Sequence, residues 1–431
     1  MPRIVWDSLL KALGIRVSLS RSYFQIAGEP QPMNTRTLLS AFFISLFFSG
    51  ALLADHYVID CGKNQSLNTA IQFASPGETI TFTGACHETV TITTSALTVA
   101  GSGSAMISPA KNSADALAVI GAQRVTLSGF TVQNGLYGIH ARGNASVTLN
   151  GVTVQKNAQS GILIESDSSA YISNSSTSGN GFNGIDAENS SSLTFTGTFT
   201  TSGNAVFGMD LGNSSSATLN SATFTATGNT LGIQVSLSSS LFLADPGCTL
   251  NASNNVTTGL TIVSGAHMVD FGGAIVANSN GINGISLFSR SGLDLDAASL
   301  VTSASNLQDG VHLEELSTLN LFNTPAFSGV PGVTTLDVHG NSKNGISALL
   351  NSQVHMFNQT AITGQNNSGF GIQVDNGSSL TLLTSTIQSN HADVSLTFGS
   401  RGEFTGNTIG TLSCDKTSLI RGDTGKSCPA P

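Results

Sequence analysis

Charged residues are scarce in this chain. It has 16 basic and 25 acidic residues, so charged side chains make up 10% of the sequence, compared with roughly 25% in ordinary globular proteins. The formal net charge is −9 and the basic residues are scattered, which predicts no nucleic-acid partner, because such a partner requires a basic patch. Proline (10 residues) and tryptophan (one residue) are also scarce. The polarity of the chain must come from uncharged side chains.

Glycine, serine, threonine and asparagine supply that polarity. The chain has 47 glycines, and all four residue types have low helix propensity, so the composition argues against a helical protein. A hydrophobic content of 39% is enough to build a core, which a typical disordered chain cannot do. Length alone predicts two or three domains, but a chain built from repeats would form fewer.

Residues 33–54 have the three parts of a secretory signal peptide. A basic start is followed by an apolar run of about a dozen residues and by small residues up to Ala54. The run is short for a membrane span, and we predict a cleaved signal with no transmembrane anchor after it. We expect residues 1–32 to be an upstream segment that is not translated. The protein is then extracytoplasmic: secreted, periplasmic or on the cell surface.

Four of the five cysteines fall near the two ends of the exported chain, and export permits disulfides. We predict the pairs Cys61–Cys86 and Cys414–Cys428, with Cys248 free. The second bridge would tie down a C-terminal tail, residues 414–431. No cysteine–histidine spacing fits a structural zinc site.

A repeat of about 24 residues runs through the middle of the chain. Its anchor is a glycine followed by an apolar residue, any residue and a second apolar residue. Successive anchor glycines are 23 to 27 residues apart, except for one interval of 35. They are Gly138, Gly161, Gly184, Gly208, Gly232, Gly259, Gly284, Gly310, Gly345 and Gly371. Such a period takes precedence over any local prediction of secondary structure.

An asparagine column accompanies the glycines. Asparagine stands four residues before most of them, from Asn134 to Asn367, and Asn229 stands three residues before its glycine. One asparagine at the same turn of every repeat predicts a ladder of stacked amides that hydrogen-bond from coil to coil.

Within each repeat the apolar residues alternate, which predicts strands. Ile162 and Ile164 form one inward pair, and two more short strands follow in each repeat, such as residues 147–149 and 152–154. Three strands and three turns predict one coil of a parallel β-helix, and residues 55–413 hold roughly a dozen coils. Residues 66–74 predict a short amphipathic helix, which would cap the N-terminal end of the core.

On these repeats the chain resembles secreted right-handed parallel β-helix proteins, the pectate-lyase-like fold of pectate lyases, polygalacturonases, alginate epimerases and many adhesin-like proteins. The resemblance covers about residues 58–413 and implies an all-β, right-handed parallel β-helix solenoid as the fold class. The sequence has no Asp-Pro-His-Asp of the alginate epimerases and no Asn-Thr-Asp or Gly-His-Gly of the polygalacturonases. Because one fold hosts many activities, the resemblance does not select a reaction.

One cluster of ionisable residues emerges when the repeat is folded. Outward positions lie two and four residues after each glycine, and adjacent coils are about 4.8 Å apart. Asp186 should therefore lie beside Asp210, and Glu165 beside Glu188. The six residues of this acidic cluster are His140, Arg142, Glu165, Asp186, Glu188 and Asp210.

The acidic cluster permits several interpretations. As a lyase site, the four carboxylates of Glu165, Asp186, Glu188 and Asp210 would bind calcium and His140 or Arg142 would take a proton. As a hydrolase site, paired carboxylates would cleave a glycosidic bond, with Asp186 and Asp210 as catalytic residues. Glu165 and Glu188 would also contact a bound ligand. The alternative is a solvated charged strip in which Arg142 pairs with Glu165.

Further along the same face, Val263 and Phe288 are predicted to be neighbours and to form a ligand-binding platform for sugar rings, unless a loop or another subunit covers them. The leading hypothesis is an exported, adhesin-like protein that binds polysaccharide or a cell-surface partner. The alternatives are a polysaccharide lyase or glycoside hydrolase acting on acidic polysaccharides, and a rigid structural spacer. No cofactor is required, and calcium is the one candidate ion.

Overall fold

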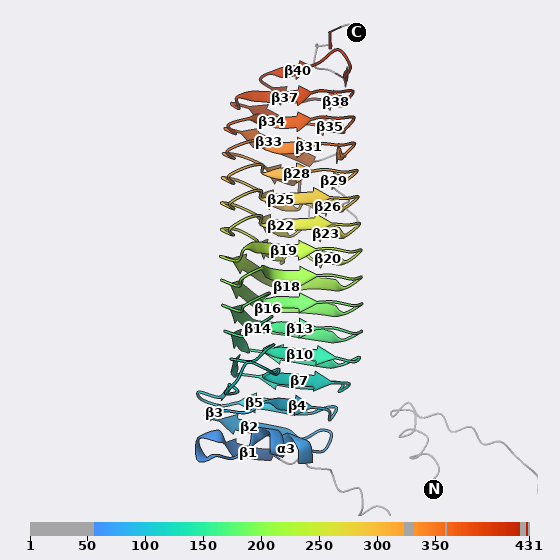
Figure 1. The fold of residues 1–431 in the computed structure, drawn as a ribbon. Helices are drawn as coiled ribbons and strands as arrows, with labels where there is room; N and C mark the ends of the chain where they lie inside the picture. The colour runs from blue at the N-terminus through green and yellow to red at the C-terminus, as the bar shows by residue number, and fades with distance from the viewer. Residues whose placement is uncertain (1–55, 323–331, 358–359, 423–427, 430–431) are drawn as a thin grey trace, which may run out of the picture. The chain divides into compact units, whose positions relative to one another are not determined.

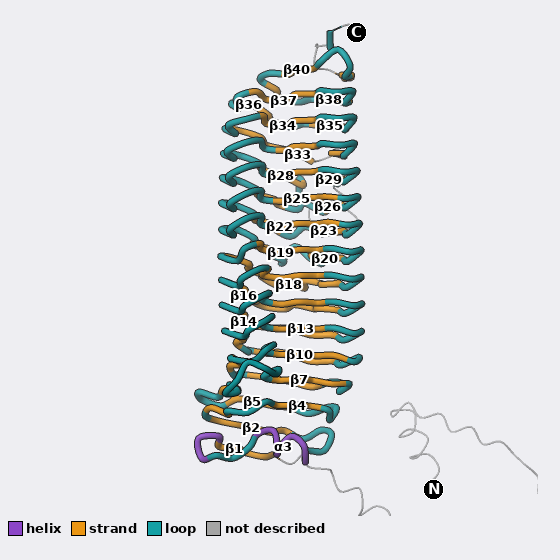
Figure 2. Tube along the Cα trace, in the orientation of Figure 1, coloured by secondary structure: helices purple, strands orange, loops and turns teal. Residues whose placement is uncertain are grey.

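The computed structural model describes residues 56–322, 332–357, 360–422 and 428–429. The upstream segment (1–32) and the signal peptide (33–54) that we predicted lie outside the described residues. The described residues belong to the compact unit Ala54–Pro431 and form a parallel β-solenoid, as predicted (Figure 1). Short strands alternate with loops in every coil, and helix is confined to the N-terminal end (Figure 2).

One sheet holds the strand that follows each anchor glycine, and it has 14 strands, slightly more than the dozen coils predicted. All its neighbours are parallel. Its strands are β4 (Val90–Ile92), β7 (Leu117–Ile120), β10 (Ile139–Arg142), β13 (Ile162–Ile164), β15 (Ile185–Ala187), β17 (Phe207–Leu211), β19 (Leu231–Val235), β22 (Leu260–Val263), β25 (Ile285–Phe288), β28 (Val311–Leu313), β31 (Ile346–Ala348), β34 (Phe370–Val374), β37 (Ala392–Leu396) and β40 (Leu412–Cys414).

The other strands of the coils make a second parallel sheet of 27 strands. These are β1 (His56–Asp60), β2 (Thr79–Thr83), β3 (Ala85–Cys86), β5 (Thr98–Gly101), β6 (Met106–Ile107), β8 (Val125–Ser128), β9 (Thr131–Gln133), β11 (Ser146–Asn150), β12 (Thr153–Gln155), β14 (Ser169–Ser178), β16 (Ser192–Ser202), β18 (Ser216–Thr227), β20 (Ser240–Leu243), β21 (Thr249–Asn251), β23 (His267–Phe271), β24 (Ala274–Val276), β26 (Gly292–Asp296), β27 (Leu300–Thr302), β29 (Thr318–Leu321), β30 (Thr334–Asp337), β32 (Gln353–Met356), β33 (Thr360–Gln365), β35 (Ser379–Leu383), β36 (Thr386–Gln388), β38 (Arg401–Thr405), β39 (Thr408–Ile409) and β41 (Leu419–Gly422).

The anchor glycines are required by the close approach of adjacent coils. A Cβ at Gly161 would lie 2.6 Å from Asn180 Nδ2 and 2.8 Å from the carbonyl oxygen of Gly184, and real Cβ atoms do not approach backbone so closely. The apolar residues on either side of each outward position, such as Ile162 and Ile164, are fully buried in one continuous core. The repeat therefore reports both the packing between coils and the inward face of the strand.

The asparagine ladder forms as predicted, and it runs from Asn157 to Asn390. Each side-chain oxygen accepts from the backbone N–H of the preceding asparagine, as between Asn180 and Asn204 at 3.1 Å. Most also accept from its amide group. Asn229 takes its place despite its shifted sequence position. Asn134, in contrast, is exposed and donates to Ser108.

A second ladder, of serines, was not predicted. It occupies the turn after the 14-stranded sheet, where Ser168 N–H donates to Ser191 Oγ and Ser191 N–H donates to Ser215 Oγ. The same bond recurs from Ser317 to Ser352 and onward to the next coil. These serines are buried, so each hydroxyl satisfies a backbone donor that would otherwise lack a partner.

The N-terminal end is closed by the predicted helix, α3 (Leu67–Phe73), after a 3₁₀ turn, η1 (Cys61–Lys63). Leu67 and Ile71 are buried against the first coils. The predicted Cys61–Cys86 disulfide forms. Glu88 accepts from the backbone N–H of Leu67 at 2.6 Å, which caps α3, because the first N–H groups of a helix lack partners within it.

At the other end, the predicted Cys414–Cys428 disulfide also forms. The strands continue past residue 413: β40 pairs with β37, and β41 pairs with β38. They therefore extend into the segment that we expected to be a tail. Cys248 is free and buried, as predicted. In the described part of the chain, no helix is long and apolar enough to span a membrane.

Candidate active site on the outer face

The acidic cluster lies on the outer face of the 14-stranded sheet, at rungs β10 to β17. The predicted register is correct: Leu163 pairs with Asp186, and Asp186 pairs with Asp210. Glu188 donates its N–H to the Ile164 carbonyl, so Glu165 and Glu188 lie on neighbouring rungs as well. The centre of this face is not solvated. His140 is 5% exposed and Asp186 is 4% exposed, whereas Arg142, Glu165, Glu188 and Asp210 are partly exposed, so the cluster has an enclosed centre and a more accessible rim.

His140 is held between two carboxylates. Its Nδ1 lies 2.8 Å from Asp115 Oδ2 and its Nε2 lies 3.0 Å from Glu165 Oε1. Burial by itself would lower the pKa of His140, but the hydrogen bonds to Asp115 and Glu165 outweigh it and raise the pKa above its ordinary value. Both ring nitrogens are engaged, so this geometry does not favour His140 as a free base.

Glu165 therefore pairs with His140 and not with Arg142. Within the described residues, Arg142 forms no ion pair with a carboxylate closer than 4.0 Å, although its side chain is only partly exposed. The pairing with Glu165 that accompanied the solvated-strip alternative does not occur. Arg142 is left available on the face as a positive charge.

A third outward column, one residue before each anchor position, was missed by the sequence analysis. It contains Asp115, Tyr137, Ser160 and Asn183, each immediately before a glycine or its weaker equivalent, Ala116. The Tyr137 ring lies 5.2 Å from the His140 ring. Burial and the nearby carboxylates, Asp186 first among them, raise the pKa of Tyr137. The repeat also indicates this column, because its residues stand at one fixed position before the glycine, but the predicted cluster was built from the two outward columns after the glycine.

Asp186 is the most perturbed carboxyl group of the cluster. Its Oδ2 accepts from Asn183 Nδ2 at 3.0 Å and from Ser160 Oγ at 3.3 Å. Its Oδ1 is buried and has no hydrogen-bond partner among the described residues. Burial, followed by the charges of Asp210 and Glu188, raises the pKa of Asp186 to about 7. An acid group in this environment is largely protonated below neutral pH.

Asp210 lies on the next rung and is more accessible. Its Oδ1 accepts from Gln234 Nε2 at 3.3 Å. Burial raises the pKa of Asp210 to about 6, against the hydrogen bond from Gln234 that lowers it. The two paired carboxyl groups therefore titrate at different pH values, and between about 6 and about 7 they hold one proton between them.

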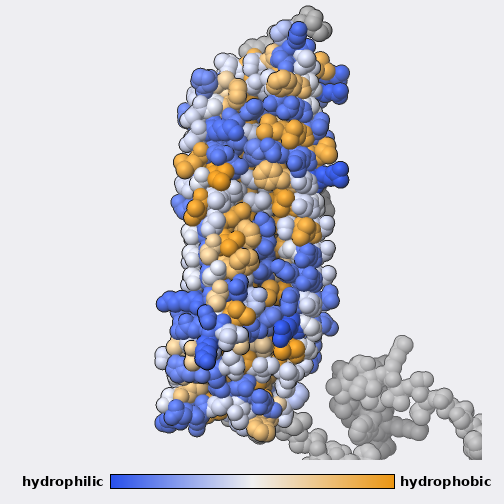
Figure 3. Space-filling model, viewed as in Figure 1, coloured by the Kyte–Doolittle hydropathy of each residue, from blue (hydrophilic) through white to orange (hydrophobic). Residues whose placement is uncertain are grey.

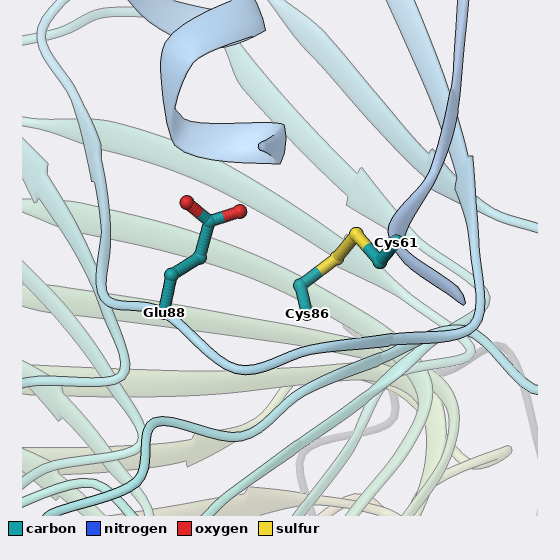
Figure 4. Close-up of side chains that lie close together, drawn as sticks. All are labelled: Cys61, Cys86 and Glu88. Carbon is teal, nitrogen blue, oxygen red and sulfur yellow. A yellow bond between two sulfur atoms is a disulfide. The ribbon is translucent and has the colours of Figure 1, made fainter. Parts of the chain in front are cut away.

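The calcium site that we predicted from Glu165, Asp186, Glu188 and Asp210 stays a prediction. One oxygen of Glu165 is engaged by His140, and one oxygen of Asp186 by Asn183. Across the described ranges, the only three ligand groups within 4.8 Å of one another are Cys61, Cys86 and Glu88. The two cysteines form a disulfide and Glu88 caps α3, so that group is structural; Figure 4 shows the carboxylate apart from the sulfur–sulfur bond.

The predicted platform residues are neighbours. Val263 and Phe288 are paired on β22 and β25, and both are partly exposed. The Phe288 ring also lies 5.6 Å from the ring of His312 on β28. Hydrophobic and hydrophilic patches alternate on the surface drawn in Figure 3. Binding of a sugar to Val263 and Phe288 stays a prediction.

Comparison with known proteins identifies the fold. The family described as the right-handed β-helix region matches residues 78–257 and 115–300, which together span more than half of the chain. No curated protein matches the sequence.

Several solved structures are similar. The A-module of a mannuronan C-5 epimerase from Azotobacter vinelandii is 15% identical with a TM-score of 0.48, and the match covers 84% of this chain and 96% of that one. A periplasmic alginate epimerase is 14% identical (TM-score 0.45; 84% and 82% covered). A pectate lyase is 14% identical (TM-score 0.27; 89% and 83% covered). At these values the likeness concerns the fold alone.

Proposed function

The chain belongs to the right-handed β-helix family, and from that premise and the geometry of its outer face we propose that it is an enzyme that acts on a polysaccharide. The observation that carries the proposal is the Asp186–Asp210 pair. Burying an acid without a full set of partners destabilises a protein. A cluster of groups with perturbed pKa values is typical of catalytic sites. Here two such groups lie opposite each other on adjacent rungs of one outer face, which an isolated buried acid does not offer.

The pair suits acid–base chemistry near neutral pH. The pKa is about 7 for Asp186 and about 6 for Asp210, so at a pH between these two values Asp186 retains its proton while Asp210 is ionised. Ionised Asp210, which is the more exposed, acts as base or nucleophile, and Asp186 acts as the acid. Strands on adjacent rungs are about 4.8 Å apart, close to the roughly 5–5.5 Å between the carboxyl groups of retaining glycosidases. Glycoside hydrolysis with retention is therefore the proposed reaction.

The charges of the site favour a neutral polysaccharide. Five carboxyl groups (Asp115, Glu165, Asp186, Glu188 and Asp210) share the site with two basic side chains, His140 and Arg142. A polyanion would be repelled unless a cation such as calcium lay between. This count weighs against the acidic polysaccharides named in our sequence-based alternative. His140 acts as a positioning residue, because it fixes the carboxylates of Asp115 and Glu165.

The proposal is tested by incubating the protein with neutral and acidic polysaccharides, with calcium or with a chelator. Release of reducing ends reports hydrolysis, and a rise in ultraviolet absorbance reports elimination. We expect reducing ends from a neutral substrate, and Asp186→Asn or Asp210→Asn to abolish their release. Glu403→Gln, an exposed change on β38 of the other sheet, is the control. Full activity of both aspartate variants, or silence on every substrate, contradicts the proposal.

Non-catalytic polysaccharide binding, our leading hypothesis from the sequence, is the second candidate. The pairing of Val263 with Phe288 supports it, because an apolar ring on a mostly polar face suits stacking against sugar rings. The two disulfides support an extracytoplasmic location for either candidate.

A further inference from the structure

The arrangement around His140 recurs seven rungs further along the 14-stranded sheet. His312 on β28 occupies the same outward position as His140 on β10. Its Nδ1 lies 2.8 Å from Asp309 Oδ2 and its Nε2 lies 3.2 Å from Glu314 Oε1. As at His140, an aromatic ring is tilted against the imidazole, here that of Phe288. An imidazole between two carboxylates, beside an aromatic ring, thus occurs twice on one face.

The second arrangement is tightly built. Asp309 is fully buried, and its Oδ1 accepts from the backbone N–H of Asn344 on the next coil at 3.0 Å. Lys343 lies 3.7 Å from Asp309 Oδ2. The backbone N–H of Asp309 donates a hydrogen bond to Asn283 Oδ1 of the preceding coil. These contacts across three coils hold His312 in one orientation, which a merely solvated histidine does not require.

The exposed part of this region combines an apolar surface with polar groups. The side chains of His312 and Glu314 are 12% and 31% exposed, and Phe288 and Val263 adjoin each other on the rungs before them. The region holds two carboxylates (the buried Asp309 and the partly exposed Glu314), one lysine and one histidine, so no strong single-sign charge selects an ion. An aromatic ring bordered by such hydrogen-bonding groups suits a neutral pyranose, whose ring face is apolar and whose rim carries hydroxyl groups.

We propose that Val263, Phe288, His312 and Glu314 form a second, distal subsite that holds a neutral sugar unit of the same polysaccharide chain, with the buried Asp309 as the positioning residue of His312. The proposal rests on the proposed function for the identity of the polymer. Seven strand spacings separate β10 from β28, about 34 Å, which corresponds to about seven sugar units at one unit per spacing. The protein then prefers long chains, because only these reach both sites and gain affinity from a second, intramolecular contact.

The test measures binding by calorimetry to laminarin, dextran and arabinoxylan, each as polymer, decamer and trimer, with Asp210→Asn so that no ligand is consumed. We expect Phe288→Ala to weaken binding of polymer and decamer by roughly threefold to tenfold. Trimer binding at the acidic cluster stays unchanged. Tyr171→Ala, which removes an exposed aromatic ring from β14 on the other sheet, is the control. Glu314→Gln keeps the shape of the subsite and should weaken the same long ligands, so a folding defect of Phe288→Ala would not leave the question open.

The two proposals fail in different ways. If Phe288→Ala and Glu314→Gln bind polymer as tightly as the parent protein, the distal subsite is wrong, whether or not Asp210 supports turnover. If the wild-type chain cleaves nothing but both variants lose polymer affinity, the proposed hydrolysis is wrong and the subsite stands. Absence of any binding to polymer overturns the subsite.

Discussion

Asp270 is an acid inside the apolar core, and replacing it should make the protein more stable. It lies on β23 and pairs in register with Leu243 on one side and Leu295 on the other. It is fully buried; Oδ1 accepts from Gly273 N–H at 2.7 Å, but Oδ2 accepts no hydrogen bond from any residue that the structure describes. Burial raises the pKa of Asp270 to about 6.

The size and sign of the effect follow from this shift. The folded-state pKa exceeds the ordinary value of 3.8 by about two units, and each unit corresponds to 1.36 kcal/mol. Below about pH 4 the Asp270 carboxyl group is protonated in both the folded and the unfolded state, so its raised pKa does not lower the stability. Between about pH 4 and about pH 6 the unfolded state ionises while the folded state keeps its proton, so stability falls as the pH rises, and above about 6 the full loss of about 3 kcal/mol is reached. Asp270→Asn keeps the acceptor for Gly273 and removes the charge.

Thermal unfolding at pH 4 and pH 8 measures this prediction. We expect Asp270→Asn to equal the wild type at pH 4 and to exceed it by about 3 kcal/mol at pH 8. Asp294→Asn is a matched control on the adjacent strand. Burial by itself would raise the pKa of Asp294, but hydrogen bonds from His267 and Asn320 hold it below its ordinary value, so this variant should lose stability at pH 8. If Asp270→Asn gains no stability at pH 8, or gains equally at both pH values, burial of Asp270 does not destabilise the protein through its charge, and the prediction is wrong.

Three further predictions concern the ladder, the site and the N-terminal end. Asn255→Ala removes the acceptor for two donors of Asn229. It should lower the free energy of unfolding by about 3 kcal/mol in thermal unfolding, since each buried unsatisfied group costs roughly 1–3 kcal/mol. A loss no larger than that caused by replacing an exposed asparagine with alanine would contradict a stabilising role of the ladder. The pH profile of kcat/KM should rise through about 6 as Asp210 ionises and fall through about 7 as Asp186 loses its proton; a flat profile would refute the pairing. Cys61→Ser removes a disulfide that joins residues 25 positions apart, and it should lower the free energy of unfolding by about 3 kcal/mol. Under reducing conditions the wild-type disulfide is broken as well, so the variant and the wild type should then be equally stable.

Much of the candidate site could be predicted from the repeat. The pairing of Asp186 with Asp210 and of Val263 with Phe288 follows from counting residues after each glycine, because parallel coils place equivalent positions on adjacent rungs. The same counting predicts the amide ladder. Asp115 and Tyr137 could also have been found, since they stand at one fixed position before the glycine column.

The coil, its register, the inward face and the two disulfides could be predicted from the sequence, because each depends on a short period or on spacing along the chain. The partner of each charged group and its burial, in contrast, became visible with the folded chain. Glu165 hydrogen-bonds to His140, 25 residues away, and not to Arg142. Asp186 is buried although it lies on the outer face. Burial and partner choice depend on side chains brought in by neighbouring coils, and they set the pKa values on which the proposed chemistry depends.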